Sequence, residues 1–200
     1  MASSTVRIVP ATDQEQRRAF AKFPWQIYRD DPNWVAPIFM DRLTLLDPEK
    51  HPFYEHAEVQ LFLAMTGDEI VGTISAHINP LHNEIYQDKV GFFGFFEVIE
   101  DYDVAQALFD TASDWLRERD MDAIRGPESF SQNEECGLLV DGFDSPPMIL
   151  TTYNPPYYES FVEQAGFEKA QDLYAWHVLT NIFDYDLSLI HISEPTRLKT

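Results

Sequence analysis

The sequence contains a single cysteine, Cys136, among 200 residues. One cysteine cannot form a disulfide within the chain, and such scarcity is typical of proteins kept in a reducing compartment. Cys136 follows two glutamates, Glu134 and Glu135, whose charges would raise the pKa of its thiol and weaken it as a nucleophile. We therefore expect a cytoplasmic protein with no disulfide framework and no cysteine nucleophile.

Basic residues are also scarce, with 14 Lys and Arg against 34 Asp and Glu, for a formal charge of −20 at pH 7. Nucleic acids and anionic membranes are bound through basic surfaces, so neither is expected as a partner. No apolar run is long enough to span a bilayer, and the start, Met1–Arg7, lacks the apolar segment of a signal peptide.

Several catalytic and metal-binding signatures are missing. The sequence contains neither a G-x-S-x-G elbow nor a P-loop. His51 and His56 are five residues apart, as are His77 and His82, whereas a helical zinc site uses histidines four apart. The sequence therefore predicts no metal site.

Hydrophobic residues make up 44% of the chain and aromatic residues 14%, which is enough to build a core and argues against disorder. Alternating or continuous apolar runs bounded by turn residues predict the strands. Strands are expected at Thr5–Val9, Glu58–Met65, Ile70–Asn79, Lys89–Ile99, Asp122–Arg125, Met148–Thr152 and Lys169–Leu179.

The clearest helix signal is the apolar stripe from Val104 to Leu116. Asp103 is the expected N-cap of this helix, and Gln106, three residues later, completes the pattern of a capping box. Further helices are expected at Asp13–Phe23, within Pro24–Pro52 and at Tyr157–Ala165, and irregular chain at Pro80–Asp88 and Glu128–Pro147. This order predicts an α/β fold, a mixed β-sheet flanked by helices on both faces.

The element order and a set of short motifs resemble the GNAT acyltransferase superfamily, and more narrowly a family of bacterial two-domain GNAT-like proteins about twice this length. The motifs are Asp30-Asp31-Pro32-Asn33-Trp34, His51-Pro52-Phe53-Tyr54, Gly91-Phe92-Phe93-Gly94-Phe95-Phe96-Glu97, Arg125-Gly126-Pro127, Gly142-Phe143, Pro155-Pro156-Tyr157-Tyr158 and Ala165-Gly166-Phe167. The resemblance implies a GNAT-like fold and an N-acyltransferase that uses acetyl-CoA or another acyl-CoA.

The resemblance also implies a glycine-rich loop, Gln/Arg-x-x-Gly-x-Gly/Ala, whose N–H groups bind the CoA pyrophosphate before a helix. The corresponding segment here, Glu97–Asp103, has no glycine and four carboxylates. These would repel a pyrophosphate, and capping the helix is their common role at such a place. We expect no CoA at this loop and place the CoA site in the second half of the longer protein.

Three residues are candidates for catalysis by the same resemblance. Glu97, at the end of the central strand, matches a carboxylate that deprotonates the amine, although a cap or a solvated carboxylate is the alternative. Asn154 matches a family asparagine, but Val162 occupies the position of the tyrosine that protonates the departing thiolate in the family. Tyr158 or its neighbour Tyr157 could substitute, with aromatic packing as the alternative.

A long polar loop, Gly126–Pro147, follows a predicted strand end. Long ordered loops in compact domains are often functional. Arg125, Asn133 and Glu134 are therefore candidates to contact a small-molecule substrate, and a domain contact or a plain surface loop is the alternative.

The end of the chain resembles the translation of a common transposase sequencing adapter, which reads LSLIHISEPTR at Leu187–Arg197. A natural short amphipathic tail is the alternative. On the adapter interpretation, residues 1–186 form a GNAT-like domain, the N-terminal half of a longer protein, and residues 187–200 are not native. The expected partner is then the missing C-terminal domain, which would cover an apolar face exposed on this half.

These patterns predict an N-acyltransferase of the GNAT superfamily, of which this chain is a degenerate first half. The alternative is a non-catalytic GNAT-like module that binds a ligand or supports its partner domain.

Overall fold

The structure is a computed structural model that describes residues 5–176. The chain divides into a unit at Met1–Lys169 and a second unit at Ala170–Thr200, which is described only as far as Trp176. The first unit contains all the helices and strands of the described residues. The predicted boundary between residues 186 and 187 lies outside them.

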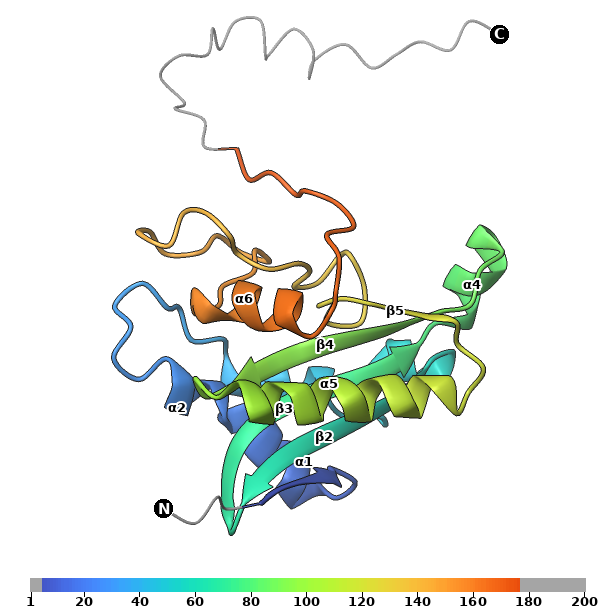
Figure 1. The fold of residues 1–200 in the computed structure, drawn as a ribbon, viewed down its shortest axis with the longest axis horizontal. Helices are drawn as coiled ribbons and strands as arrows, with labels where there is room; N and C mark the ends of the chain where they lie inside the picture. The colour runs from blue at the N-terminus through green and yellow to red at the C-terminus, as the bar shows by residue number, and fades with distance from the viewer. Residues whose placement is uncertain (1–4, 177–200) are drawn as a thin grey trace, which may run out of the picture. The chain divides into compact units, whose positions relative to one another are not determined.

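Five strands form one sheet in the order β1-β2-β3-β4-β5 (Figure 1). The strands are β1 (Val6–Pro10), β2 (Glu58–Thr66), β3 (Glu69–Ile78), β4 (Val90–Val98) and β5 (Ala123–Arg125). Neighbours pair antiparallel from β1 to β4, whereas β4 and β5 pair in parallel. This confirms the predicted mixed sheet.

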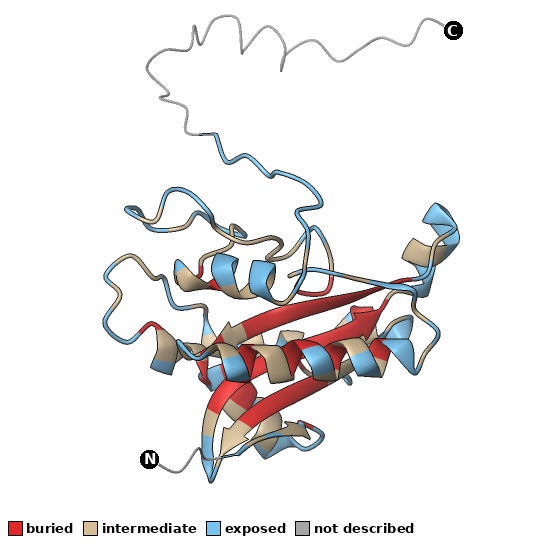
Figure 2. Ribbon diagram, in the orientation of Figure 1, coloured by how far each residue is buried: buried red, intermediate tan, exposed pale blue. Residues whose placement is uncertain are grey.

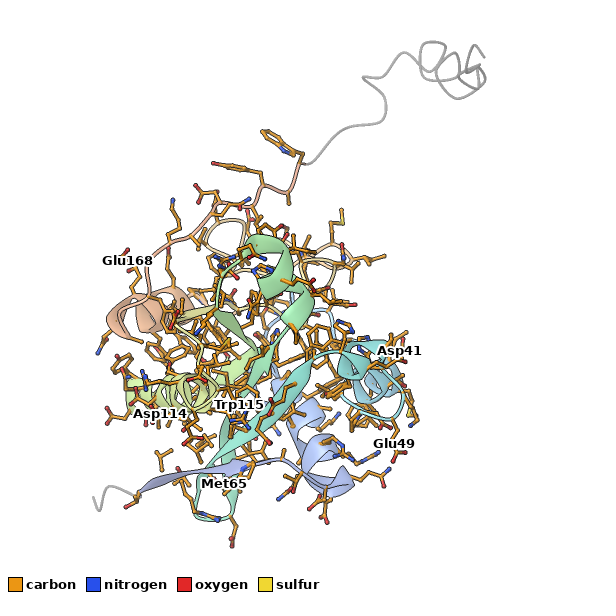
Figure 3. The ribbon with its side chains drawn as sticks, turned by 90° about the vertical axis from the view of Figure 1, so that its right-hand side faces the viewer. Asp41, Glu49, Met65, Asp114, Trp115 and Glu168 are labelled. Atoms are coloured by element: carbon orange, nitrogen blue, oxygen red, sulfur yellow. The ribbon has the colours of Figure 1, made fainter. Side chains whose placement is uncertain are left out.

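Helices cover both faces of the sheet, as predicted. On one face, α5 (Tyr102–Arg117) and α6 (Tyr157–Gln164) share an apolar cluster with the strands. On the other, α1 (Gln14–Lys22), α3 (Phe39–Leu45) and the short 3-10 helix η1 (Pro52–Glu55) contribute to a second cluster. Figure 3 shows the two sides, with Asp114 and Trp115 marking α5 and Asp41 marking α3.

The apolar stripe of α5 explains why one face of this helix is buried. Val104, Leu108, Ala112 and Leu116 recur at helical spacing and are all buried against the sheet. Burial is concentrated along the central strands and this face of α5 (Figure 2). None of the helices in residues 5–176 is long and apolar enough to cross a bilayer.

Two predictions about helix ends were wrong. Asp101, not Asp103, caps α5, because its carboxylate accepts a hydrogen bond from the Asp103 N–H at 3.0 Å. Gln106 donates to Asp110 instead of completing a capping box. The helix begins one residue before the predicted cap, since Tyr102 is already helical.

The predicted loop at Pro80–Asp88 contains a helix, α4 (Pro80–Tyr86). Asn79 accepts hydrogen bonds from the N–H groups of Leu81 and His82, and Pro80 takes the first helical position. Leu81 and Ile85 are exposed, so the helix has no buried apolar stripe. Its signal lies in the cap and the proline alone.

Two predicted strands are absent. Residues 148–152 form a turn in which the apolar side chains of Met148, Ile149 and Leu150 are exposed, and Leu150 has a positive φ of 62°. Residues 169–176 contain no strand, and the rest of the predicted Lys169–Leu179 strand lies outside the described residues. Both predictions rested on apolar content, which does not distinguish a strand from exposed irregular chain.

Candidate functional site

An extra residue in β4 determines which way Glu97 points. Thr73 pairs with Glu97 and Ser75 with Gly94, so two steps along β3 face three steps along β4. This is a β-bulge, and Phe95 within it has a positive φ of 45°. Phe93 packs on the α5 face before the bulge, and Phe96 packs on the same face after it. Glu97 is thereby turned toward the opposite face, against the segment that follows α1.

Two tyrosine hydroxyls hold the half-buried carboxylate of Glu97. Tyr28, directly after helix α2 (Pro24–Ile27), donates to Glu97 Oε2 at 2.9 Å, and Tyr158 of α6 donates to the same oxygen at 2.8 Å. Among the described residues, no hydrogen bond reaches the other oxygen, Oε1. That oxygen keeps its capacity to accept a proton.

Burial dominates the electrostatics of this carboxylate. It raises the pKa of Glu97 to about 7, although the hydrogen bonds from Tyr158 and Tyr28 act to lower it. The pKa values of both tyrosines are raised well above 10, by burial first and by the charge of Glu97 second. At neutral pH the tyrosines therefore remain protonated donors, while Glu97 has a pKa close to the ambient pH.

Tyr158 also completes the open edge of β4. Strand β5 pairs with β4 only from Val90 to Phe92, so no strand lies beside the backbone of Val98 on the β5 side of β4. The Val98 N–H donates to the Tyr158 hydroxyl at 2.7 Å, and the Val98 carbonyl accepts from the Tyr157 hydroxyl at 2.8 Å. The two tyrosines at the start of α6 thus anchor that helix to the strand that carries Glu97.

A small cavity lies beside Glu97. Its volume of about 20 Å³ is close to the space that one water molecule needs. Arg42 and Glu135 line it and form a paired contact in which Arg42 donates to both carboxylate oxygens at 3.0 and 3.1 Å. Arg42 acts to lower the pKa of Glu97, and Glu135 acts to raise it.

The chain itself occupies the side of β4 beyond β5. The Glu128 N–H donates to the Phe93 carbonyl at 2.7 Å, and a Cβ on Gly94 would lie 2.0 Å from the Glu128 carbonyl oxygen. The Ser129 N–H donates to the Glu135 carbonyl at 2.8 Å. The first part of the long loop is therefore ordered against the strand.

The structure places the other predicted site residues apart from Glu97. Asn154 is buried and exchanges hydrogen bonds with the backbone of Leu139 at 2.7 and 3.2 Å, which fastens the long loop to the start of α6. Arg125 and Asn133 are exposed and Glu134 is half-buried. None of the hydrogen bonds of the described residues joins these side chains to Glu97.

Sequence reasoning missed Tyr28, Arg42 and Glu135. Tyr28 lies 69 residues before Glu97 and Arg42 lies 93 residues before Glu135, so no local spacing connects either pair. The one local signal is that Tyr28 lies two residues before the motif at residues 30–34. No three His, Cys, Asp or Glu side chains within residues 5–176 are grouped to hold a metal ion.

No family model matches the chain. Over 175 residues the chain is 42% identical to the bacterial ceramide synthase of Caulobacter vibrioides (strain NA1000 / CB15N), a match that covers 87% of this chain and 46% of the relative. Over 182 residues it is 37% identical to protein YghO of Escherichia coli (strain K12), covering 91% of this chain and 46% of YghO. The chain spans about half the length of these curated relatives.

Solved structures share the fold at low sequence identity. An aminoglycoside acetyltransferase from an uncultured soil metagenomic sample, in complex with sisomicin, superposes with a TM-score of 0.52 at 10% identity, covering 88% of this chain and 96% of that one. A tandem GNAT protein from the clavulanic acid biosynthesis pathway gives a TM-score of 0.52 at 14% identity, covering 81% of this chain and 43% of that one.

A predicted acetyltransferase of Clostridium acetobutylicum, whose structure contains acetyl-CoA, has a TM-score of 0.50 at 11% identity and covers 86% of this chain and 95% of that one. Structural similarity at these identities establishes the fold, and the reaction must be argued from the residues of the site. The chain therefore has the GNAT fold, and it is related in sequence to a bacterial ceramide synthase and to YghO over about half the length of each.

Proposed function

We propose that this chain is part of an N-acyltransferase in which Glu97 is the general base. The observation that carries the proposal is a half-buried carboxylate with a pKa of about 7, held through one oxygen by two tyrosine hydroxyls. A base with a pKa near the working pH is effective in proton transfer. The relative named a ceramide synthase supports amide formation as the reaction, because a ceramide is an N-acylated amine.

In the proposed reaction an amine nitrogen attacks the thioester carbonyl of an acyl-CoA. A carbon–nitrogen bond forms, the carbon–sulfur bond breaks, and free CoA leaves as the thiol. Glu97 Oε1 accepts the proton that the amine loses, and solvent supplies the proton that the sulfur gains. Tyr28 and Tyr158 act as positioning residues that orient the carboxylate, and Asn154 positions the long loop.

We place the acyl-CoA on the part of the longer protein outside this chain. Glu100, Asp101 and Asp103 surround the start of α5, where a pyrophosphate would otherwise meet a helix N-terminus. The relatives have room for a second region, because each is about twice as long as the segment that this chain matches.

A non-catalytic module is the second candidate. It is favoured by the acidic residues around the start of α5 and by the chain that fills the side of β4 at Gly94. On that account Glu97 and its tyrosines form a structural anchor for α6.

The test places this chain in the matching segment of the Caulobacter vibrioides relative and follows CoA thiol release with an acyl-CoA and an amine. We expect Glu97→Gln to lower kcat/KM by about 100-fold or more. Glu100→Gln, an exposed carboxylate three residues away, is the matched control and should retain activity. An active protein that tolerates Glu97→Gln would refute the base, and an inactive chimera beside an active relative would favour the non-catalytic module.

A further inference from the structure

A second, larger cavity opens on the other side of Tyr28. Its volume of about 590 Å³ lies within the range of small-molecule sites. One wall is the chain from the end of α2 to Pro32, and the other is formed by Phe143, Tyr153 and Pro156. Two of the sequence motifs that the proposed reaction leaves unused, at residues 30–34 and 142–143, meet here.

Long-range hydrogen bonds fix the two walls against each other. The Tyr153 hydroxyl donates to Asp31 Oδ2 at 2.7 Å, and Asn33 Nδ2 donates to the Phe143 carbonyl at 3.0 Å. The Asn33 N–H also donates to Asp31 Oδ1 at 2.9 Å. Each Asp31 oxygen thus accepts one hydrogen bond and has capacity for another. These hydrogen bonds join the two walls of an open cavity, and residues of both walls hold the Asp31 carboxylate.

Tyr28 connects this cavity to Glu97. Its ring stacks on Trp34 at a centroid distance of 4.9 Å and contacts the ring of Tyr153 at 5.9 Å. Its hydroxyl lies 2.9 Å from Glu97 Oε2 and 3.3 Å from the Tyr153 carbonyl oxygen. The residues on either side of Tyr28, Ile27 and Arg29, line the cavity. Tyr28 therefore joins the wall of the cavity to the proposed base, since its chain neighbours line the cavity and its hydroxyl donates to Glu97.

The lining selects a class of ligand. Asp30 and Asp31 supply two negative charges against the single positive charge of Arg29, and the chain as a whole carries −20, which attracts cations. Ile27, Phe143 and Pro156 supply apolar surface. An organic ammonium ion with an apolar body satisfies both features, whereas an organic anion of the same size satisfies only the apolar one.

We propose that this cavity binds the amine acceptor as an organic ammonium ion, with Asp31 and Asp30 recognising the cationic nitrogen and the apolar wall holding the body. This assignment rests on the proposed N-acyltransferase function and names its acceptor class. The ion binds in this cavity as a cation. Before it attacks, it gives one proton to solvent and its nitrogen moves to within hydrogen-bond reach of Glu97 Oε1, which accepts the second proton as the amide forms.

The test measures binding of octylammonium to the 200-residue chain by isothermal titration calorimetry, without any acyl donor. We expect octylammonium to bind, octanoate not to bind, and added salt to weaken the octylammonium affinity. Asp31→Asn should weaken that affinity by about tenfold or more, because it removes the charge, while the amide oxygen can still accept from the Asn33 N–H and the amide NH2 can donate to the Tyr153 hydroxyl. Asp30→Asn, at an exposed side chain where folding is not at risk, should weaken it in the same direction.

Asp141→Asn is the matched control, because Asp141 is an exposed acid of the long loop, two residues before Phe143 and outside the cavity lining. Equal binding of octanoate and octylammonium, or unchanged affinity in both Asp31→Asn and Asp30→Asn, would overturn the assignment. Binding that survives in Glu97→Gln separates this site from the proposed base. A failure to bind octylammonium would refute the acceptor site while leaving the base to its own test.

Discussion

At the scale of single residues, burial and hydrogen bonding act on Glu97 in opposite directions. Burial raises the pKa of its carboxyl, and the hydroxyls of Tyr158 and Tyr28 lower it. The resulting pKa of about 7 shows that burial is the larger effect. The same tyrosines hold one carboxylate oxygen, so the residue combines a hydrogen-bonded position with a pKa raised toward neutral pH.

Removing one of these donors should move the pH dependence of activity. Tyr28→Phe deletes a hydrogen bond that stabilises the ionised form, so the pKa of Glu97 should rise. The acid limb of the kcat/KM profile should shift upward by roughly one unit, because a hydrogen bond to a charged group contributes about 1.5 kcal/mol or more. Activity lost at pH 7 should return at higher pH. A limb that stays in place or moves to lower pH would contradict the assigned base.

The family resemblance makes Glu97 a candidate base at the end of a buried strand, and that role stays a prediction. Its hydrogen-bond partner Tyr28 could not be found from the sequence. Tyr28 reaches Glu97 only because the bulge at Phe95 moves the side chains that follow it to the opposite face of the sheet. A run of phenylalanines is apolar on both faces, so its sequence gives no sign of the extra residue. Tyr158 was predicted as a candidate acid, and the structure also gives it a structural task at the edge of β4.

At the scale of elements, the close approach of residues 128–129 to β4 depends on the absence of a side chain at Gly94. Gly94→Ala would place a methyl group against the Glu128 backbone, which cannot move as a flexible side chain can. We expect a loss of roughly 3 kcal/mol in the free energy of unfolding by urea denaturation.

Gly67→Ala is the control for this change, since nothing lies within 4 Å of its added carbon and only its φ of 60° opposes the substitution. Its cost should be roughly 1 kcal/mol. Equal losses at the two positions would mean that residues 128–129 are free to move away from β4.

Element prediction succeeded where burial and periodicity agreed, as in α5 and β4. It failed where one signal stood alone. The helix α4 lacks an apolar stripe because Leu81 and Ile85 are exposed, and the apolar run at residues 148–150 lies on the surface instead of entering the sheet. The tertiary structure decides which element covers a given segment, and a short stretch of sequence does not carry that information.

At the scale of the whole molecule, the order of the elements was enough to predict the fold class. The relatives are about twice as long as the matched segment, and this chain exposes Val140, Met148, Ile149 and Leu150. The charge of −20 bears on ligand choice more directly, because it favours a cationic acceptor at the cavity beside Tyr28.

The most direct measurement of the central claim is a carbon-13 NMR titration of the Glu97 carboxyl carbon in the 200-residue chain, assigned by comparison with Glu97→Gln. It requires neither a substrate nor an acyl donor. The account predicts a titration midpoint at about 7, since burial raises the pKa of this carboxyl to that value. A midpoint near the ordinary glutamate value of about 4.3 would show an ordinary solvated carboxylate and would contradict Glu97 as the general base.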